Sequence, residues 1–220
     1  MAEIEHPTAN VTWRDGDVPV STRFDDPYYS LENGLAETEH TFLSGNDLPA
    51  RFRDGFHVAE LGFGTGLNFL ATVRAWREAG TPGTLHYTSF ELYPMDPSDA
   101  ERALDAFPGL FEKDLAPMWE GELSLPWLEA RVVTGDARKT LPAWSQKADA
   151  WFLDGFSPAK NPELWEPALM AAVGAHTAPG GTCATYSAAG AIRRSLEDAS
   201  FSVERVPGYG RKRHMTRGQR

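Results

Sequence analysis

Residues 57–70 read HVAELGFGTGLNFL, and this stretch predicts a buried strand, a glycine turn and the start of a helix. Glycines stand at alternate positions of the turn, at Gly62, Gly64 and Gly66, and Glu60 ends the strand. Glycine permits positive φ and a close approach of a ligand to the backbone, because it lacks a Cβ. A turn that leads into a helix also presents free backbone N–H groups and the positive end of the helix dipole. The stretch therefore predicts a nucleotide-like ligand.

The spacing of these glycines separates two classes of ligand. The dinucleotide fingerprint G-x-G-x-x-G requires glycine at position 67, where the chain has Leu67. The spacing therefore does not favour NAD. An acidic residue two positions before the first glycine is similar to the first motif of S-adenosylmethionine methyltransferases. A glycine turn needed only for tight packing is the alternative, so the rest of the chain has to decide.

The composition is that of a globular protein. The chain has 220 residues, of which 41% are hydrophobic and 11% aromatic, and this suits one domain with a sizeable core. The sequence has no apolar run long enough to span a bilayer and no signal-peptide pattern at its start. Cys183 is the only cysteine, which fits a cytoplasmic protein, and the six histidines are scattered, so we expect no metal site.

The charge of the chain is unevenly distributed. Its formal net charge is −10, which makes it a poor non-specific binder of nucleic acid. No acidic residue follows Glu204, however, and six basic residues do: Arg205, Arg211, Lys212, Arg213, Arg217 and Arg220. This basic ending is either a surface for an anionic partner or a solvated tail.

Strand and helix patterns alternate along most of the chain. Apolar runs predict strands at 56–62, 84–92, 131–135, 148–154 and 181–186, with helices at 66–79, 97–107, 110–119, 163–177 and 188–199. Such alternation predicts an α/β fold with a doubly wound, mostly parallel sheet. Two final strands, near 201–206 and 213–218, are joined by six residues, too few for a crossover helix, so we expect an antiparallel hairpin. Before the sheet, we expect an irregular segment at 11–30 and a helix at 31–43. We also expect Ser187 to cap the start of the helix at 188–199.

Four predicted strands end in an acidic residue. In open α/β sheets the ligand lies beyond the carboxyl ends of the strands, where Glu60, Glu91, Asp136 and Asp154 are expected. Glu91 suits two ribose hydroxyls, with a turn-capping role as the alternative. Asp136 suits the amino group of adenine, with an Asx turn as the alternative.

Asp154 opens the segment DGFSPAKNP, residues 154–162. A primary alkylamine, with a pKa of about 10.4, is mostly protonated at neutral pH, and only the neutral amine attacks a methyl group. A carboxylate would orient such an amine and accept its proton. Phe156 is placed to stack on a flat base, or else simply to pack.

Five blocks of this sequence resemble the methyltransferase domain of the MnmC family, which also occurs alone as MnmD. They are FDDPYYS at 24–30, VAELGFGTGLNFL at 58–70, WFLDGFSPAKNP at 151–162, PGGT at 179–182 and GYGRKRHM at 208–215. The resemblance implies the class I methyltransferase fold and the cofactor S-adenosylmethionine. It also implies methylation of 5-aminomethyl-(2-thio)uridine at the wobble position of tRNA, giving the 5-methylaminomethyl form.

The resemblance and the residue patterns together assign the candidate site. We expect Asp154 to be catalytic and a first group of residues to bind the cofactor: Glu60, Gly62, Gly64, Gly66, Asn68, Glu91 and Asp136. A second group is expected to contact the base or the RNA: Phe156, Lys160, Arg211, Lys212 and Arg213. We further expect residues 1–55 to pack on a methyltransferase domain of residues 56–220.

The resemblance also implies partners. These are the anticodon arm of tRNA and a flavin-dependent oxidase that makes the amine, fused to the chain or separate. No membrane and no metal are expected. Two other functions remain open: a class I methyltransferase for a small-molecule or protein amine, and a non-catalytic RNA- or partner-binding module. The basic ending favours the tRNA enzyme, and the strand-end acids argue against the non-catalytic module.

Overall fold

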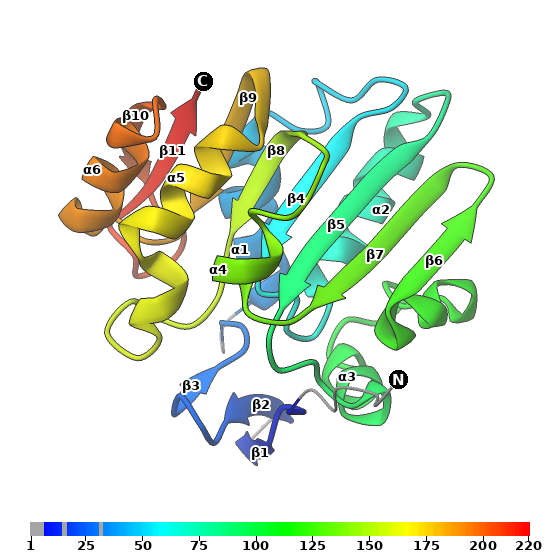
Figure 1. Ribbon diagram of the computed structural model, residues 1–220. Helices are drawn as coiled ribbons and strands as arrows, with labels where there is room; N and C mark the ends of the chain where they lie inside the picture. The colour runs from blue at the N-terminus through cyan, green and yellow to red at the C-terminus, as the bar shows by residue number, and fades with distance from the viewer. Residues whose placement is uncertain (1–6, 15–16, 31–32) are drawn as a thin grey trace, which may run out of the picture.

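The computed structural model describes residues 7–14, 17–30 and 33–220, and an eight-stranded sheet lies at its centre (Figure 1). The strand order is β10-β11-β9-β8-β4-β5-β7-β6. Five adjacent strands are parallel: β4 (His57–Leu61), β5 (Leu85–Glu91), β7 (Leu128–Thr134), β8 (Ala148–Leu153) and β9 (Thr177–Thr185). The predicted hairpin of β10 (Ser202–Pro207) and β11 (His214–Gln219) is confirmed, and β11 runs antiparallel to β9. The doubly wound, mostly parallel α/β sheet is therefore confirmed.

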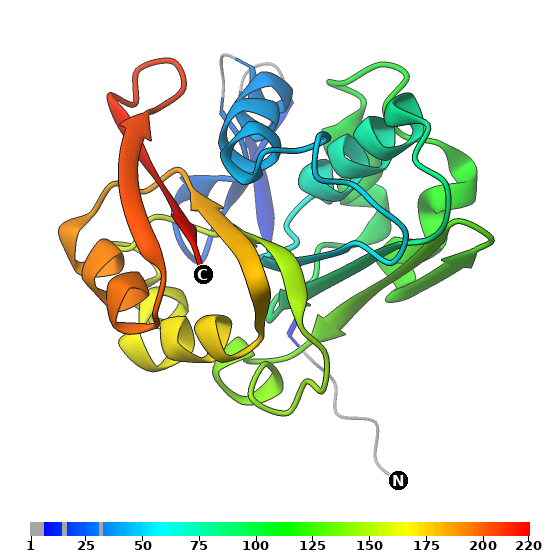
Figure 2. The ribbon, with the colours of Figure 1, turned by 90° about the horizontal axis from the view of Figure 1, so that it is seen from above.

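Helices cover both faces of this sheet (Figure 2). On one face lie α1 (Gly34–Thr38) and α2 (Leu67–Ala79), and on the other lie α4 (Ala137–Thr140), α5 (Pro167–Ala175) and α6 (Gly190–Asp198). Neighbouring residues of one strand face opposite layers. Phe152 thus packs in the core with α2, and Trp151 packs in the core with α5 and α6.

The N-terminal segment is more ordered than the sequence predicted. Instead of an irregular stretch, β1 (Val11–Arg14), β2 (Val18–Ser21) and β3 (Asp26–Pro27) form a small antiparallel sheet. This sheet lies beyond the carboxyl ends of the central strands (Figure 1). The sequence did not predict these strands, because each has only two to four residues among many turn residues, too few for an alternating pattern to stand out.

The predicted helix at 31–43 differs from the observed one. Its first two residues, 31 and 32, lie outside the described part of the chain. The α-helix is short, and it continues as a π-helical turn (Glu39–Leu43) and a 3₁₀ turn (Ser44–Asn46). Phe42 and Leu43 from this segment join the core that α2 buries.

Smaller differences between the predicted and the observed elements remain, and prolines explain the first two. The helix expected at 110–119 is a 3₁₀ helix (Lys113–Glu120) that contains Pro117, and a break before Pro167 separates a 3₁₀ turn (Pro162–Trp165) from α5. The cap expected at Ser187 is wrong, because α6 starts after Ala189. The edge strand β6 (Glu122–Leu125) and α4 were not predicted. Asp96 caps α3 (Pro97–Leu104) and Gly80 ends α2. Among the described residues, no helix is long and apolar enough to cross a membrane.

Candidate active site

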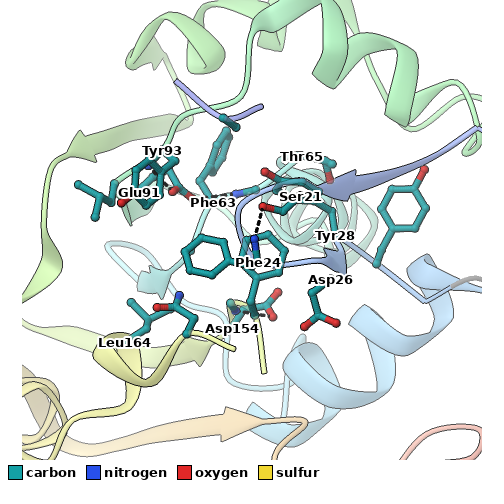
Figure 3. A pocket seen from close by; sticks show the side chains of 18 of the residues that line it. Ser21, Phe24, Asp26, Tyr28, Phe63, Thr65, Glu91, Tyr93, Asp154 and Leu164 are labelled. Atoms are coloured by element: carbon teal, nitrogen blue, oxygen red, sulfur yellow. Dashed lines mark hydrogen bonds between the residues drawn. The ribbon is translucent and has the colours of Figure 1, made fainter. Parts of the chain in front are cut away.

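A cavity of about 650 Å³ opens at the carboxyl ends of the central strands (Figure 3). The loops after β4, β5, β7 and β8 line one part of it, as the sheet topology requires. The N-terminal segment lines the rest, with Arg23, Phe24 and Tyr28 among the contributing residues. Figure 3 shows Phe24 and Tyr28 facing the same space as Glu91 and Asp154. The cavity is therefore built jointly by the parallel sheet and the small N-terminal sheet.

The glycine turn has the backbone conformation that the sequence predicted. The φ angles are +83° at Gly62, +56° at Gly64 and +82° at Gly66, and residues that carry a side chain rarely adopt such values. Gly62 and Gly64 line the cavity, and a Cβ on Gly62 would lie 3.2 Å from the Cα of Gly155. Gly66 is not part of the lining. A Cβ there would lie 2.5 Å from the ring of Trp119, so this glycine makes room for an aromatic side chain.

Glu91 lies at the end of β5 and lines the cavity. Its Oε1 accepts a hydrogen bond from the backbone N of Tyr93 at 2.8 Å, and its Oε2 accepts one from the N of Gly64 at 3.2 Å. These bonds leave each oxygen able to accept a further hydrogen bond. Burial raises the pKa of Glu91. The predicted contact with two ribose hydroxyls remains compatible with this geometry and stays a prediction.

Asp136 has a second role that the sequence left open. It is the N-cap of α4, where Oδ1 accepts from the backbone N of Arg138 at 3.0 Å. The guanidinium of Arg138 binds both carboxylate oxygens and lowers the pKa of Asp136. The Asx alternative thus describes what this side chain does here. Asp136 also lines the cavity, so contact with adenine stays a prediction.

Asp154, Asn68 and Glu60 form one buried hydrogen-bonded group. Asp154 lines the cavity, and its Oδ1 accepts from the N of Gly155 at 2.8 Å. Its Oδ2 accepts from Nδ2 of Asn68 at 2.7 Å, and the same nitrogen donates to Oε1 of Glu60 at 2.9 Å. Burial raises the pKa of Asp154 to about 6 and that of Glu60 to about 8. Glu60 is fully buried and does not line the cavity, so it reaches the site only through Asn68.

Phe156 lines the cavity within an aromatic cluster. Its ring stacks on Phe24 with centroids 4.7 Å apart and an interplanar angle of 27°, and it meets the edge of Tyr28 at 5.0 Å. The packing alternative is therefore realised, although a base could still meet the cluster from the cavity. The sequence analysis did not identify Phe24, Tyr28 or Tyr93 as lining residues. The aromatic residues of the 24–30 block were the available signal.

The predicted RNA-binding cations are not all in one place. Lys160 binds the backbone oxygen of Asp25 and, at 3.3 Å, the carboxylate of Asp26, so it ties the loop after β8 to the N-terminal segment. Lys212 lines the cavity: its Nζ lies 2.5 Å from Glu37 and 4.1 Å from the ring centroid of Tyr186. Arg211 and Arg213 are exposed in the hairpin loop. Lys212 is exposed as well, but it also lines the cavity.

No cluster suited to a metal appears in the described ranges. There, no group of three or more His, Cys, Asp or Glu side chains has the arrangement that would hold an ion.

The fold and the cavity define a class I S-adenosylmethionine-dependent methyltransferase. A family model described as S-adenosyl-L-methionine-dependent methyltransferase matches residues 112–220. The structure of a precorrin-6y C5,15-methyltransferase from Geobacter metallireducens GS-15 shares the fold, with a TM-score of 0.51, 14% identity and 93% coverage of each chain. At that identity the likeness concerns the fold alone.

More specific relatives are the tRNA 5-methylaminomethyl-2-thiouridine biosynthesis bifunctional proteins MnmC. The protein of Caulobacter sp. (strain K31) is 45% identical over 94% of this chain, and that of Stutzerimonas stutzeri is 41% identical over 96%. The crystal structure of MnmC2 from Aquifex aeolicus has a TM-score of 0.72 and 25% identity, and the match covers 98% of this chain and 71% of that one. The chain belongs to this methyltransferase family. It spans only 38% and 34% of the length of the two MnmC proteins.

Proposed function

We propose that this chain transfers a methyl group from S-adenosylmethionine to the exocyclic amine of 5-aminomethyl-(2-thio)uridine at the tRNA wobble position. The product would be the 5-methylaminomethyl nucleoside. One observation carries the proposal: a half-buried carboxylate, Asp154, opens into the cavity beside the glycine turn at Gly62. The relatives named for 5-methylaminomethyl-2-thiouridine biosynthesis support the same substrate.

The residues around the turn fit the cofactor. Gly62 and Gly64 present backbone without side chains to the cavity at positive φ. A Cβ on either would lie 3.2 Å from an atom of Gly155 or Tyr28, so local packing requires glycine here as well. Glu91 retains acceptor capacity for two hydroxyls, and Phe63 and Leu92 offer apolar surface nearby. We place the cofactor along Gly62, Gly64 and Glu91, where it would supply an electrophilic methyl group on a sulfonium.

The chain's own contribution is to position the amine and to accept its proton. Held along Gly62, Gly64 and Glu91, the cofactor would supply the methyl group to the neutral nitrogen, and the electron pair of its carbon–sulfur bond would return to sulfur. The nitrogen then carries a positive charge and an extra proton, which passes to Asp154 and on to water. A carboxylate with a pKa of about 6 is ionised at neutral pH and suited to this step. In-line alignment of the reactants supplies much of the acceleration.

The substrate and partners follow from the same proposal. Arg211 and Arg213 would contact phosphates of the anticodon arm, and Phe156 with Phe24 would hold the uracil ring. The amine would come from an oxidase, fused or separate, and the protein would act in the cytoplasm. Residues 1–55 would form one structural domain with residues 56–220, since Phe42 and Leu43 already pack in the shared core.

Methyl transfer to defined substrates tests the proposal. The purified chain would be incubated with methyl-labelled S-adenosylmethionine and one of three acceptors: tRNA carrying 5-aminomethyl-2-thiouridine, the same tRNA unmodified, and the free aminomethyl nucleoside. We expect labelling of the first alone. Equal labelling of the free nucleoside would favour a small-molecule methyltransferase, and no labelling of any acceptor would overturn the proposed activity.

A further inference from the structure

Both N–H donors of the Asn68 amide are occupied by protein groups. Nδ2 donates one hydrogen to Asp154 at 2.7 Å and the other to Glu60 at 2.9 Å. Oδ1 accepts from the hydroxyl of Thr38 at 2.8 Å. A primary amide has two N–H donors, so no donor remains for a cofactor. The expected role of this side chain in cofactor binding therefore conflicts with its hydrogen bonds.

The chemistry of its neighbours fixes which way the amide points. Two carboxyl groups face one end of the Asn68 side chain, and a hydroxyl faces the other. Rotating the amide by 180° would place its oxygen against both carboxyl groups. At most one of those contacts could be repaired by a protonated carboxyl. The donor end must face Asp154 and Glu60.

We propose that Asn68 is a positioning residue that orients the Asp154 carboxylate toward the cavity and favours its ionised form, while Glu60 keeps its proton. The inference rests on the proposed function of Asp154 as the proton acceptor. Asn68 lies in the first turn of α2, two residues after Gly66, and is 5% exposed, so the amide is held by packing as well as by its hydrogen bonds. Oδ1 of Asp154 is fixed in turn by Gly155.

Other charged and titratable groups also face Asp154. They come from every element around it: Glu60 of β4, Tyr87 of β5, Glu37 of α1, Tyr186 after β9 and Lys212 of the hairpin loop. Lys212 lowers the pKa of Asp154 and Glu37 raises it. Since these two side chains are 2.5 Å apart, their effects on Asp154 largely offset each other. Asn68 is left as the neutral side chain that favours the ionised carboxylate of Asp154 by direct hydrogen bonding. Its bond to Glu60 lowers the pKa of that group too, against the larger effect of burial.

Thr38 connects this group to the N-terminal part of the chain. It ends α1, and its hydroxyl is buried at 4% exposure where it meets Asn68. Removing that hydroxyl would leave the oxygen end of the amide without its hydrogen bond, so the amide would be held less firmly. The effect on Asp154 should be in the same direction as removing the amide itself, and smaller. Thr72 offers a matched control, because its hydroxyl binds the backbone oxygen of Asn68 rather than the amide.

A carboxyl titration tests the proposal without substrate. The aspartate carboxyl carbons would be labelled with carbon-13, and the Asp154 signal would be assigned by its loss in Asp154→Asn. In Asn68→Ala the midpoint of the Asp154 titration should move upward by about one pH unit, and in Thr38→Val by less. Thr72→Val should titrate as the parent does.

Activity and cofactor affinity supply the second readout. In acid, the rate of Asn68→Ala should fall off at a higher pH than the parent rate, by the same shift as the titration midpoint. Calorimetry should find the affinity for S-adenosylmethionine within about twofold of the parent. Weakened cofactor affinity with an unchanged titration would overturn the proposal and restore the cofactor role. If Asn68→Ala does not fold, a Thr38→Val titration equal to that of Thr72→Val overturns it. The titration stands even if aminomethylated tRNA is not methylated, so the two failures are distinguishable.

Discussion

At the residue scale, burial decides how two carboxyl groups 2.7 and 2.9 Å from one amide nitrogen behave. Asp154 has a pKa of about 6 and Glu60 of about 8, so at neutral pH the first is ionised and the second holds a proton. The sequence marked both as acids at strand ends. It did not separate them, because the depth of each side chain depends on the loops packed above.

Replacing Asp154 with asparagine tests its role as proton acceptor. The parent rate should rise with pH through about 6 as Asp154 ionises, because only the carboxylate accepts a proton. Asp154→Asn should lose this limb and run about 100-fold slower at neutral pH, with partial recovery at higher pH as the free amine becomes common. Single-turnover rates between pH 5 and 9 measure this. A parental rate throughout would make Asp154 a structural residue.

Glu60 makes a prediction about stability. Its ordinary pKa of 4.5 applies in the unfolded chain, while the folded chain holds the proton up to about pH 8. Unfolding therefore releases a proton between these values, and the free energy of unfolding should fall as pH rises across that window. Glu60→Gln should flatten this dependence in denaturant titrations at pH 5 and pH 8. The exposed substitution Glu101→Gln should leave it unchanged. A parental slope in Glu60→Gln would mean that Glu60 is ionised in the fold.

Glu91 makes a prediction about the cofactor. If its carboxylate accepts two ribose hydroxyls, Glu91→Ala should weaken binding of S-adenosylmethionine by about 1–3 kcal/mol, the range for losing a hydrogen bond to a charged group. Calorimetry measures the affinity directly, with Glu101→Ala as the exposed control. Unchanged affinity would remove the ribose assignment.

At the scale of elements, the sequence predicted what repeats along the chain and missed what depends on distant pairing. The inner strands, α2 and the terminal hairpin follow from apolar periodicity and connection length. The sheet of β1, β2 and β3 did not, because strands of two to four residues are too short for an alternating pattern to stand out. The N-terminal wall of the cavity was missed for the same reason. Phe24 meets Phe156 across 132 positions of sequence only once that sheet is folded.

The turn between β4 and α2 is the element that most directly shapes the site. Gly62→Ala would combine an unfavourable φ of +83° with a Cβ 3.2 Å from Gly155, the residue that follows Asp154. Gly80→Ala is a matched control, since its φ is +61° and no atom lies within 4 Å of its Cβ. Both should lose about 1–2 kcal/mol of stability. Only Gly62→Ala should lose cofactor affinity in calorimetry. Equal affinity in both variants would show that the turn does not contact the cofactor.

At the scale of the whole molecule, the charge is arranged against non-specific RNA binding. The net charge is −10, and several basic residues of the ending are committed to the protein. Arg217 pairs with Glu204 and Asp47, Arg220 binds the carbonyl oxygens of Gly174 and Thr177, and Lys212 lies at the cavity. The number of these cations can be read from the sequence. The sequence could not tell which of them face solvent, since that depends on partners brought in by the sheet.

The surface prediction concerns Arg211 and Arg213, which are exposed in the loop of the hairpin. Figure 2 shows that loop extending beyond the sheet on the side of α1. Lys212, in the same loop, binds Glu37 of α1. Arginine suits phosphate because its planar guanidinium donates two parallel hydrogen bonds. If each arginine meets one phosphate, Arg211→Gln/Arg213→Gln should lower the slope of log K against log salt by about 1.5. Cofactor affinity should not change.

A second double variant, which removes the same number of positive charges, is the control for the salt dependence. Lys113→Gln/Lys139→Gln removes two exposed cations from elsewhere on the surface, so any change of slope caused by net charge alone appears in both double variants. Adding Lys212→Met to the hairpin variant separates the cavity from the surface. This third change should slow methyl transfer without lowering the slope further, because Lys212 faces Glu37 and Tyr186 rather than a phosphate. A hairpin variant that binds tRNA with the parental slope would place the RNA surface elsewhere, with the N-terminal sheet beside Phe24 as the next region to test.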